Sequence, residues 1–155
     1  MGHIFTIKEF LPGMIKAKRG HIVTIGSLAS VVGVNGMADY CGTKAATNAI
    51  DDSLRMELVE LGISSFIKTT LVNPYYINTG MFDGLKSFLP ILEAQPTVDR
   101  IIQGILQEEV SFTVPAYLSS IYAIKGILPA RAFDALMRVL QVDKALTEFK
   151  GRPKL

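Results

Sequence analysis

The chain has 155 residues, of which 49% are hydrophobic and 19% are charged, and its formal net charge at neutral pH is +2. This length suits one domain with a real core, and the weak charge gives no reason to expect nucleic acid as a partner. The single Cys41 excludes an internal disulfide and has no metal-ligand spacing around it, so we expect a reducing compartment and no metal site.

The first predicted element is a helix at residues 5–17. Its apolar residues recur at helical spacing, and Arg19-Gly20 is a stop signal. Pro12-Gly13 within this stretch favours a kink or an early end. Residues 1–8 lack a basic stretch followed by an apolar run, so no signal peptide is expected.

A strand, a loop and a long helix follow. Residues 21–25 predict a buried strand through Ile22, Val23 and Ile25, and residues 27–39 predict a glycine-containing loop. We predict a helix at residues 39–61, with Gly62 as its cap and with Asp51 and Asp52 on its solvated face. The residues expected to face inward are Ala45, Ala46, Ala49, Ile50, Leu54 and Leu58.

The next stretch predicts a second buried parallel strand and then an apolar loop. The strand spans residues 65–72 and ends at Asn73-Pro74. The loop, residues 75–96, either packs onto the core or forms a lid over a lipophilic substrate, and we favour the lid. Its large apolar residues are Tyr75, Tyr76, Met81, Phe82, Phe88, Leu89, Ile91 and Leu92.

The carboxyl-terminal third is mostly helical in prediction. Thr97 is expected to open a helix that runs to about Glu109 and buries Ile101, Ile102, Ile105 and Leu106, and residues 112–114 form a third short strand. An apolar helical tail follows at residues 115–149, with an amphipathic helix from Arg131. Its apolar run is shorter than the ~20 residues of a spanning helix. It either lies in a membrane interface or packs on protein, and the sequence favours neither.

Three reactive side chains in this order have a common chemistry. Tyr40 and Lys44 stand four residues apart and share one helix face, while Ser27 follows the carboxyl end of a strand, where ligands bind in open α/β sheets. A lysine ammonium stabilises a nearby phenolate and lowers the pKa of the phenol toward neutrality, so the pair can act as an acid and a base. A serine beside them can hold a substrate oxygen. The sequence therefore predicts an alcohol or carbonyl site.

These motifs carry a family resemblance that covers nearly the whole chain. The segments GHIVTIGSLAS, NGMADYCGTKAATNAIDDSLRMEL and KTTLVNPYYINTGMF resemble the carboxyl-terminal half of a short-chain dehydrogenase/reductase. The flanking FLPGM and FLPIL narrow the resemblance to the branch that holds retinol dehydrogenase 10, epidermal retinol dehydrogenase and 17-beta-hydroxysteroid dehydrogenase type 11. The resemblance makes Ser27, Tyr40 and Lys44 catalytic. It also implies that Tyr40, Lys44, Pro74, Ile77 and Thr79 bind the cofactor, NAD or NADP.

The resemblance also implies a fold and a function. The fold is a three-layer, doubly wound parallel α/β sheet of the Rossmann type, of which residues 1–155 would form the carboxyl-terminal part. The function is oxidoreduction at the CH-OH group of a lipophilic alcohol: a retinol, a steroid or a long-chain alcohol. The complete enzyme would be a homo-oligomer at the cytoplasmic side of the endoplasmic reticulum membrane or at a lipid-droplet surface.

The sequence departs from the family pattern in two ways, and these bear on cofactor binding and activity. Tyr75 stands where most of the family has glycine, and the glycine-rich dinucleotide loop and the family's catalytic asparagine are absent from the sequence. We therefore expect the chain as given to be an inactive fragment whose cofactor binding needs an amino-terminal half. The alternative is a non-catalytic module that binds a lipid surface or a protein partner through half of the fold.

Overall fold

The centre of the molecule is a parallel sheet of three strands. The computed structural model describes residues 1–81, 84–85 and 87–147, and in this part of the chain β1 (Gly20–Ile25), β2 (Ile67–Pro74) and β3 (Ser111–Val114) pair in the order β1-β2-β3. Gly20 of β1 is level with Ile67 of β2, and Leu71 of β2 is level with Ser111 of β3. All three predicted strands are confirmed, although β2 runs two residues further than expected, through Pro74.

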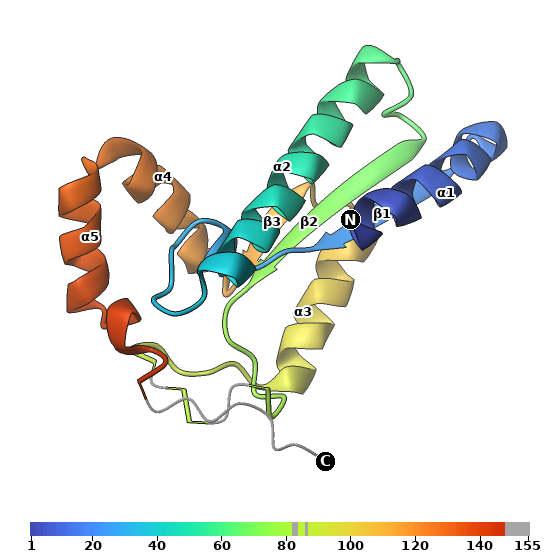
Figure 1. Cartoon of the computed structure of the whole chain (residues 1–155). Helices are drawn as coiled ribbons and strands as arrows, with labels where there is room; N and C mark the ends of the chain where they lie inside the picture. Colours follow the sequence, from blue (N-terminus) through green and yellow to red (C-terminus); the bar gives the residue numbers. More distant parts are fainter. Residues whose placement is uncertain (82–83, 86, 148–155) are drawn as a thin grey trace.

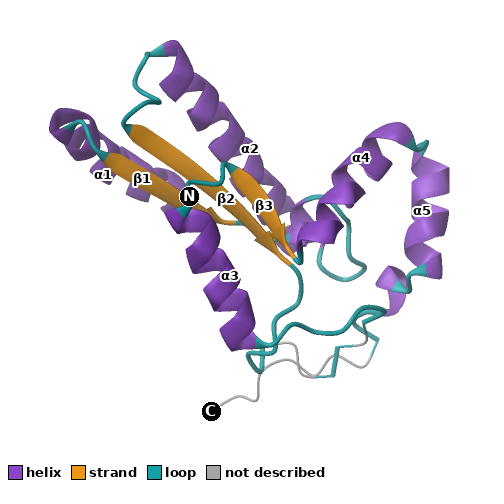
Figure 2. Cartoon of the chain, turned by 180° about the vertical axis from the view of Figure 1, so that it is seen from behind, coloured by secondary structure: helices purple, strands orange, loops and turns teal. Residues whose placement is uncertain are grey.

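Helices cover both faces of this sheet and form the three predicted layers. On one face lie α1 (Gly2–Ala17) and α2 (Ala38–Glu60), and on the other lies α3 (Ala94–Leu106) (Figures 1 and 2). The alternation of side chains along β2 serves both layers, since Ile67 packs with Leu54 and Leu58 of α2, whereas Val72 packs with Phe112 and faces α3. The predicted α/β class is confirmed.

The bounds of two helices were predicted only in part. Helix α1 ends at Ala17, as predicted, but it begins at Gly2 rather than Phe5 and continues through Pro12, so the proline does not end it early. Helix α3 begins at Ala94, three residues before Thr97, and it ends at Leu106 rather than near Glu109. The Thr97 hydroxyl donates to the carbonyl oxygen of Glu93 at 2.7 Å, within the first turn, and therefore does not cap the helix.

The inward face of α2 was predicted correctly only in its carboxyl-terminal half, where Leu54 and Leu58 are buried. Ala45, Ala46 and Ala49 are exposed, whereas Asp51 is buried with 1% of its surface accessible. The inward positions before Leu54 face polar groups, since the Asn48 amide donates to the Ser30 hydroxyl and Asp51 lies beside the Thr24 hydroxyl of β1. Ala49 and Ile50 instead line an open groove of about 880 Å³ between α1 and α2.

Other apolar residues expected in the core lie outside it. Ile102 and Leu106 of α3 are exposed, because only one stripe of this short helix reaches the sheet. In β1 the buried residue is Thr24, and Ile25 is 47% exposed. Strand β1 pairs only with β2 in the described part of the chain, so one of its edges stays open.

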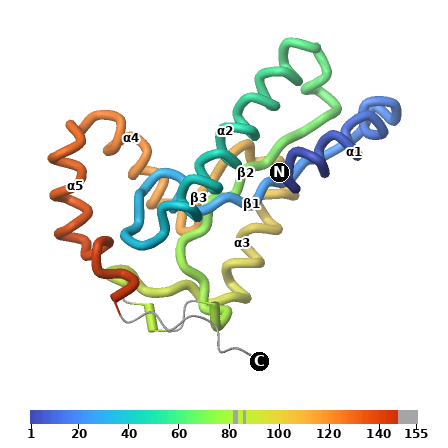
Figure 3. Tube along the Cα trace, viewed as in Figure 1, coloured from blue at the N-terminus to red at the C-terminus, as the bar shows by residue number. Residues whose placement is uncertain are grey.

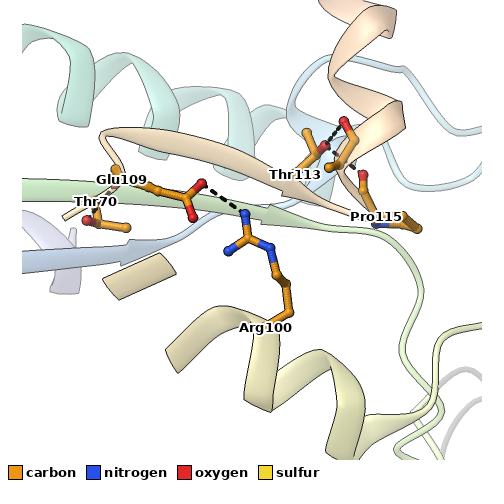
Figure 4. Close-up of polar contacts among 6 residues, drawn as sticks. Thr70, Arg100, Glu109, Thr113 and Pro115 are labelled. Atoms are coloured by element: carbon orange, nitrogen blue, oxygen red, sulfur yellow. Dashed lines mark hydrogen bonds and ion pairs between the residues drawn. The ribbon is translucent and has the colours of Figure 1, made fainter. Parts of the chain in front are cut away.

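A polar clamp joins α3 to the amino-terminal end of β3 (Figure 4). The Arg100 guanidinium pairs with the Glu109 carboxylate at 2.9 Å and lies 4.3 Å from the centre of the Phe112 ring. The Thr70 hydroxyl of β2 donates to the carbonyl oxygen of Glu109 at 2.8 Å. At the other end of β3 the Thr113 hydroxyl donates to the carbonyl oxygen of Pro115 at 2.7 Å. These contacts hold β3 at its register.

The carboxyl-terminal helices stand beyond the carboxyl ends of the strands. They are α4 (Ser120–Ile127) and α5 (Ala130–Val139), and in Figure 3 they lie on the far side of the loop that follows β1. Helix α5 ends ten residues before Phe149, where the predicted helix ended, and Phe149 itself lies outside the described residues. No helix in the described ranges is long and apolar enough to cross a membrane.

Candidate functional site

Ser27 lies where the chain leaves the carboxyl end of β1. The N–H of Gly26 still donates to the carbonyl oxygen of Val72 in β2 at 2.7 Å, but the N–H of Ser27 donates to Oδ1 of Asn73, also at 2.7 Å. The Ser27 hydroxyl oxygen accepts the N–H of Ala29 at 3.2 Å and so caps the short helix Leu28–Ser30. The hydroxyl proton is not used in that contact and can be donated to a substrate oxygen.

Tyr40 and Lys44 lie one turn apart at the amino end of α2, as their spacing predicts. The Lys44 ammonium nitrogen is 5.8 Å from the centre of the Tyr40 ring and donates to the carbonyl oxygen of Ile25, the last residue of β1, at 2.9 Å. Burial lowers the pKa of Lys44. One of its three N–H donors is fixed on β1, which leaves two for a ligand.

One cleft of about 610 Å³ brings the predicted site residues together. All six residues proposed from the sequence line it, and they come from three separate parts of the chain: the segment after β1, the start of α2 and the segment after β2. These residues are Ser27, Tyr40, Lys44, Pro74, Ile77 and Thr79. The cleft therefore lies at the carboxyl edge of the sheet, where the parallel topology places ligand sites.

The apolar loop after β2 forms part of the wall of this cleft. Tyr75, Met81 and Phe88 line it, and Phe82 lies outside the described residues. The Ser87 hydroxyl donates to the carbonyl oxygen of Leu89 at 2.7 Å, so the Tyr75 hydroxyl donates to Ser87, at 2.6 Å. A bridge between Ile77 and Leu92 closes the base of the loop. These contacts fix the described residues on both sides of the loop at the cleft.

The tyrosines of the cleft differ in what they can do chemically. Burial raises the pKa of Tyr76 to about 12 and also raises the pKa of Tyr75. Both phenols therefore hold their protons at neutral pH and are poor proton acceptors there. Tyr40, in contrast, has the Lys44 ammonium beside its ring.

The structure adds residues to the site that the sequence analysis missed. Helices α4 and α5, with the short 3-10 helix that precedes α4, supply an apolar wall to the cleft through Leu118, Ile121, Ile124, Leu136 and Met137. Asn73, at the end of β2, supports Ser27 from behind. A polar side chain at the carboxyl end of an otherwise apolar strand was the available signal for Asn73, whereas nothing in the sequence placed α4 and α5 against the cleft.

Comparisons with known proteins agree with this geometry. A sequence model described as short chain dehydrogenase matches residues 1–89. The chain is 38% identical to "Epidermal retinol dehydrogenase 2" of Mus musculus over 98% of its own length and 50% of that protein, and 36% identical to "Short-chain dehydrogenase/reductase family 16C member 6" of Bos taurus over 99% and 50%. The chain thus spans about half the length of these curated relatives.

A solved structure shares the fold. The "Short-chain dehydrogenase from Sphingobium yanoikuyae in complex with NADPH" superposes with a TM-score of 0.56 at 26% identity, over 84% of this chain and 46% of that one. The resemblance to the family and to its retinol dehydrogenase branch is confirmed. So is the Rossmann-like arrangement of the sheet and its helices.

Proposed function

This chain belongs to the short-chain dehydrogenase family, and from that premise we propose that it carries the catalytic centre for NAD(P)-linked oxidation of a lipophilic alcohol, or for the reverse reduction of a carbonyl compound. The observation that carries the proposal is the convergence of Ser27, Tyr40 and Lys44 on one cleft. We expect this activity when the chain is combined with the other half of the fold, which its longer relatives contain.

The three side chains have distinct roles in this proposal. Tyr40 Oη takes the proton of the alcohol during oxidation and returns it to the carbonyl oxygen during reduction. The Ser27 hydroxyl donates a hydrogen bond to the same substrate oxygen and orients it. The Lys44 ammonium is held by the carbonyl oxygen of Ile25 and lies 5.8 Å from the centre of the Tyr40 ring, where its charge stabilises the negative charge that develops on Tyr40 Oη during proton transfer.

The residues of the cleft fit the nicotinamide end of NAD or NADP. Pro74 is buried at the end of β2, Ile77 offers an apolar surface, and Thr79 and Lys44 offer polar groups at the rim. The bound cofactor would supply the hydride acceptor for oxidation and the hydride donor for reduction. The sequence contains no glycine-rich dinucleotide loop, so we propose that a further part of the fold, beside the open edge of β1, is needed to bind the pyrophosphate.

The wall of the cleft supports a lipophilic substrate. Apart from the catalytic groups it is lined mostly by aliphatic and aromatic side chains, from the loop after β2 and from α4 and α5. Retinols, steroids and long-chain alcohols all suit such a wall. Exposed apolar residues at the same end of the molecule, such as Tyr117 and Ile127, could insert into a lipid surface. They therefore favour a location at the endoplasmic reticulum membrane or at a lipid droplet.

The test is reconstitution of turnover. The chain would be co-expressed with the half of mouse epidermal retinol dehydrogenase 2 that it does not match, and NADH or NADPH formation would be followed with retinol, a hydroxysteroid and a fatty alcohol. We expect turnover of at least one of these alcohols and none from that half alone. A stable, monodisperse complex that binds cofactor but oxidises none of the three, and reduces none of the matching carbonyl compounds, would favour the non-catalytic binding module instead.

A further inference from the structure

Asn73 is a fully buried polar residue near the carboxyl end of β2. It is the penultimate residue of β2, none of its surface is accessible, and its neighbours along the strand, Val72 and Pro74, are also buried. A buried amide without hydrogen bonds destabilises a fold by about 1–3 kcal/mol. Both ends of this amide are satisfied: one partner, Ser27, lines the cleft, and the other, Tyr122, lies in α4, whose Ile121 and Ile124 line it.

The orientation of the Asn73 amide follows from its partners. A backbone N–H can only donate, so the atom 2.7 Å from the N–H of Ser27 must be the oxygen, Oδ1. The nitrogen, Nδ2, then donates to the hydroxyl oxygen of Tyr122 in α4, also at 2.7 Å. The N–H of Ser27 thus fixes the orientation of the amide, and the Tyr122 hydroxyl, which can donate or accept, accepts from the end that remains.

Ser27 depends on this contact because its amide has left the sheet. Strand β1 ends at Ile25, and the last backbone bond to β2 is made by Gly26. The packing around that glycine is close, since a Cβ on Gly26 would lie 2.1 Å from Oδ1 of Asn73 and 2.7 Å from Oδ1 of Asn48. Without Asn73, the N–H of Ser27 would lose its partner and the segment would lose the surface that it packs against.

Helix α4 is tied to the same segment at a second point. The Lys125 ammonium, one turn after Tyr122, donates to the carbonyl oxygen of Val31, in the loop between β1 and α2. Figures 1 and 2 show this loop beside α4 from both sides. Burial raises the pKa of the Tyr122 phenol, although hydrogen bonds with Ser30, Asn48 and Asn73 oppose the shift. The phenol is therefore neutral at physiological pH and can accept from Asn73.

We propose that Asn73 is a positioning residue for Ser27, and that Tyr122 fixes the Asn73 amide so that α4, a wall of the substrate cleft, is linked to the serine. The side chain of Asn73 does not touch the substrate in this proposal. It acts through the backbone of Ser27, whose hydroxyl holds the substrate oxygen. The expected effect of Asn73 on kcat therefore rests on the function proposed above.

The first test needs neither cofactor nor substrate. In the 155-residue chain labelled with 15N-serine, the Ser27 amide signal and its hydrogen exchange would be compared between the native chain, Asn73→Leu and Asn73→Asp. We expect Asn73→Leu to shift the signal and speed exchange about tenfold, as loss of one hydrogen bond implies, whereas Asn73→Asp keeps an acceptor and changes exchange less than threefold. Equal exchange in all three proteins would overturn the proposal, whether or not the enzyme turns over.

The second test separates positioning from stability in the reconstituted enzyme. Thr70→Val is the matched control, because Thr70 is also fully buried in β2 and hydrogen-bonded through its side chain but lies toward the other end of the strand. We expect Asn73→Leu to lower kcat about tenfold with KM within about twofold, and Tyr122→Phe to have the same effect to a smaller degree. Thr70→Val should lower the melting temperature only. Equal kcat values for Asn73→Leu and Thr70→Val would contradict the positioning role.

Discussion

Asp51 is predicted to destabilise the fold at neutral pH. It lies on the inward face of α2 with 1% of its surface exposed, and its Oδ1 has no hydrogen-bond partner in the described part of the chain. Burial raises the pKa of the carboxyl, and the neighbouring Thr24 hydroxyl opposes this only in part. The native state therefore keeps the proton at a higher pH than the unfolded state, in which the pKa is about 4.

The sign of the pH dependence follows from this difference. Between the unfolded pKa and the raised native pKa, the native state binds more protons, so the free energy of unfolding falls as pH rises through that window. Below the window Asp51 is protonated in both states and has no such effect. Asp51→Asn removes the ionisation, and it should raise the free energy of unfolding at pH 7.5 by about 1.4 kcal/mol for each unit by which the native pKa exceeds the unfolded one.

Urea unfolding followed by circular dichroism from pH 4.5 to 8 would measure this. Asp52→Asn is the control, because the Asp52 side chain is 62% exposed and pairs with Arg55 on the helix surface, so its loss should change stability by less than about 0.5 kcal/mol. The advantage of Asp51→Asn should shrink toward pH 4.5. If Asp51→Asn is the less stable protein at pH 7.5, the carboxylate has a stabilising partner and the reasoning is wrong.

Three further predictions concern the site and the exposed surfaces. Gly26→Ala should lower the free energy of unfolding by about 1–3 kcal/mol in urea, since its Cβ would meet Asn73, whereas Gly33→Ala, with open space around it, should not. Liposome co-sedimentation of the whole chain should fall when the exposed Ile127 and Val139 are both replaced by Asp; equal sedimentation of the two proteins would favour packing on protein over a membrane interface. Finally, the purified chain should self-associate through the open edge of β1 and show no NADH or NADPH binding by calorimetry, and a monodisperse monomer that binds either at micromolar concentration would refute this.

The sequence was sufficient to predict the sheet, and the six residues that it proposes for the site line one cleft. The strands are mostly β-branched and apolar, a composition typical of a buried parallel sheet. Because parallel strands all run in one direction, their carboxyl ends lie at one edge of the sheet. Once Ser27, Tyr40 and Pro74 are placed at that edge, the cleft follows from topology. The family resemblance supplied the roles of these residues, which composition and spacing do not determine.

What the sequence could not predict depends on contacts between distant segments. The burial of Asp51 and the exposure of Ala49 reverse the usual preferences of the two residue types, because the inward positions of α2 before Leu54 face polar groups such as the hydroxyls of Thr24 and Ser30. The link from Asn73 to Tyr122 spans 49 residues, and periodicity carries no information at that range. Helices α4 and α5 were predicted as a tail, and only the tertiary structure places them against the site.

In the proposed reaction Tyr40 transfers the substrate's proton. The direct measurement is kcat of the reconstituted enzyme with its best alcohol for the native chain, Tyr40→Phe and Thr47→Val, the last of which removes a hydroxyl from the same helix outside the cleft. Tyr40→Phe should lower kcat by a factor of about 100 or more with an unchanged circular dichroism spectrum, and Thr47→Val should leave kcat within about twofold. Turnover by Tyr40→Phe at the native rate would contradict the claim.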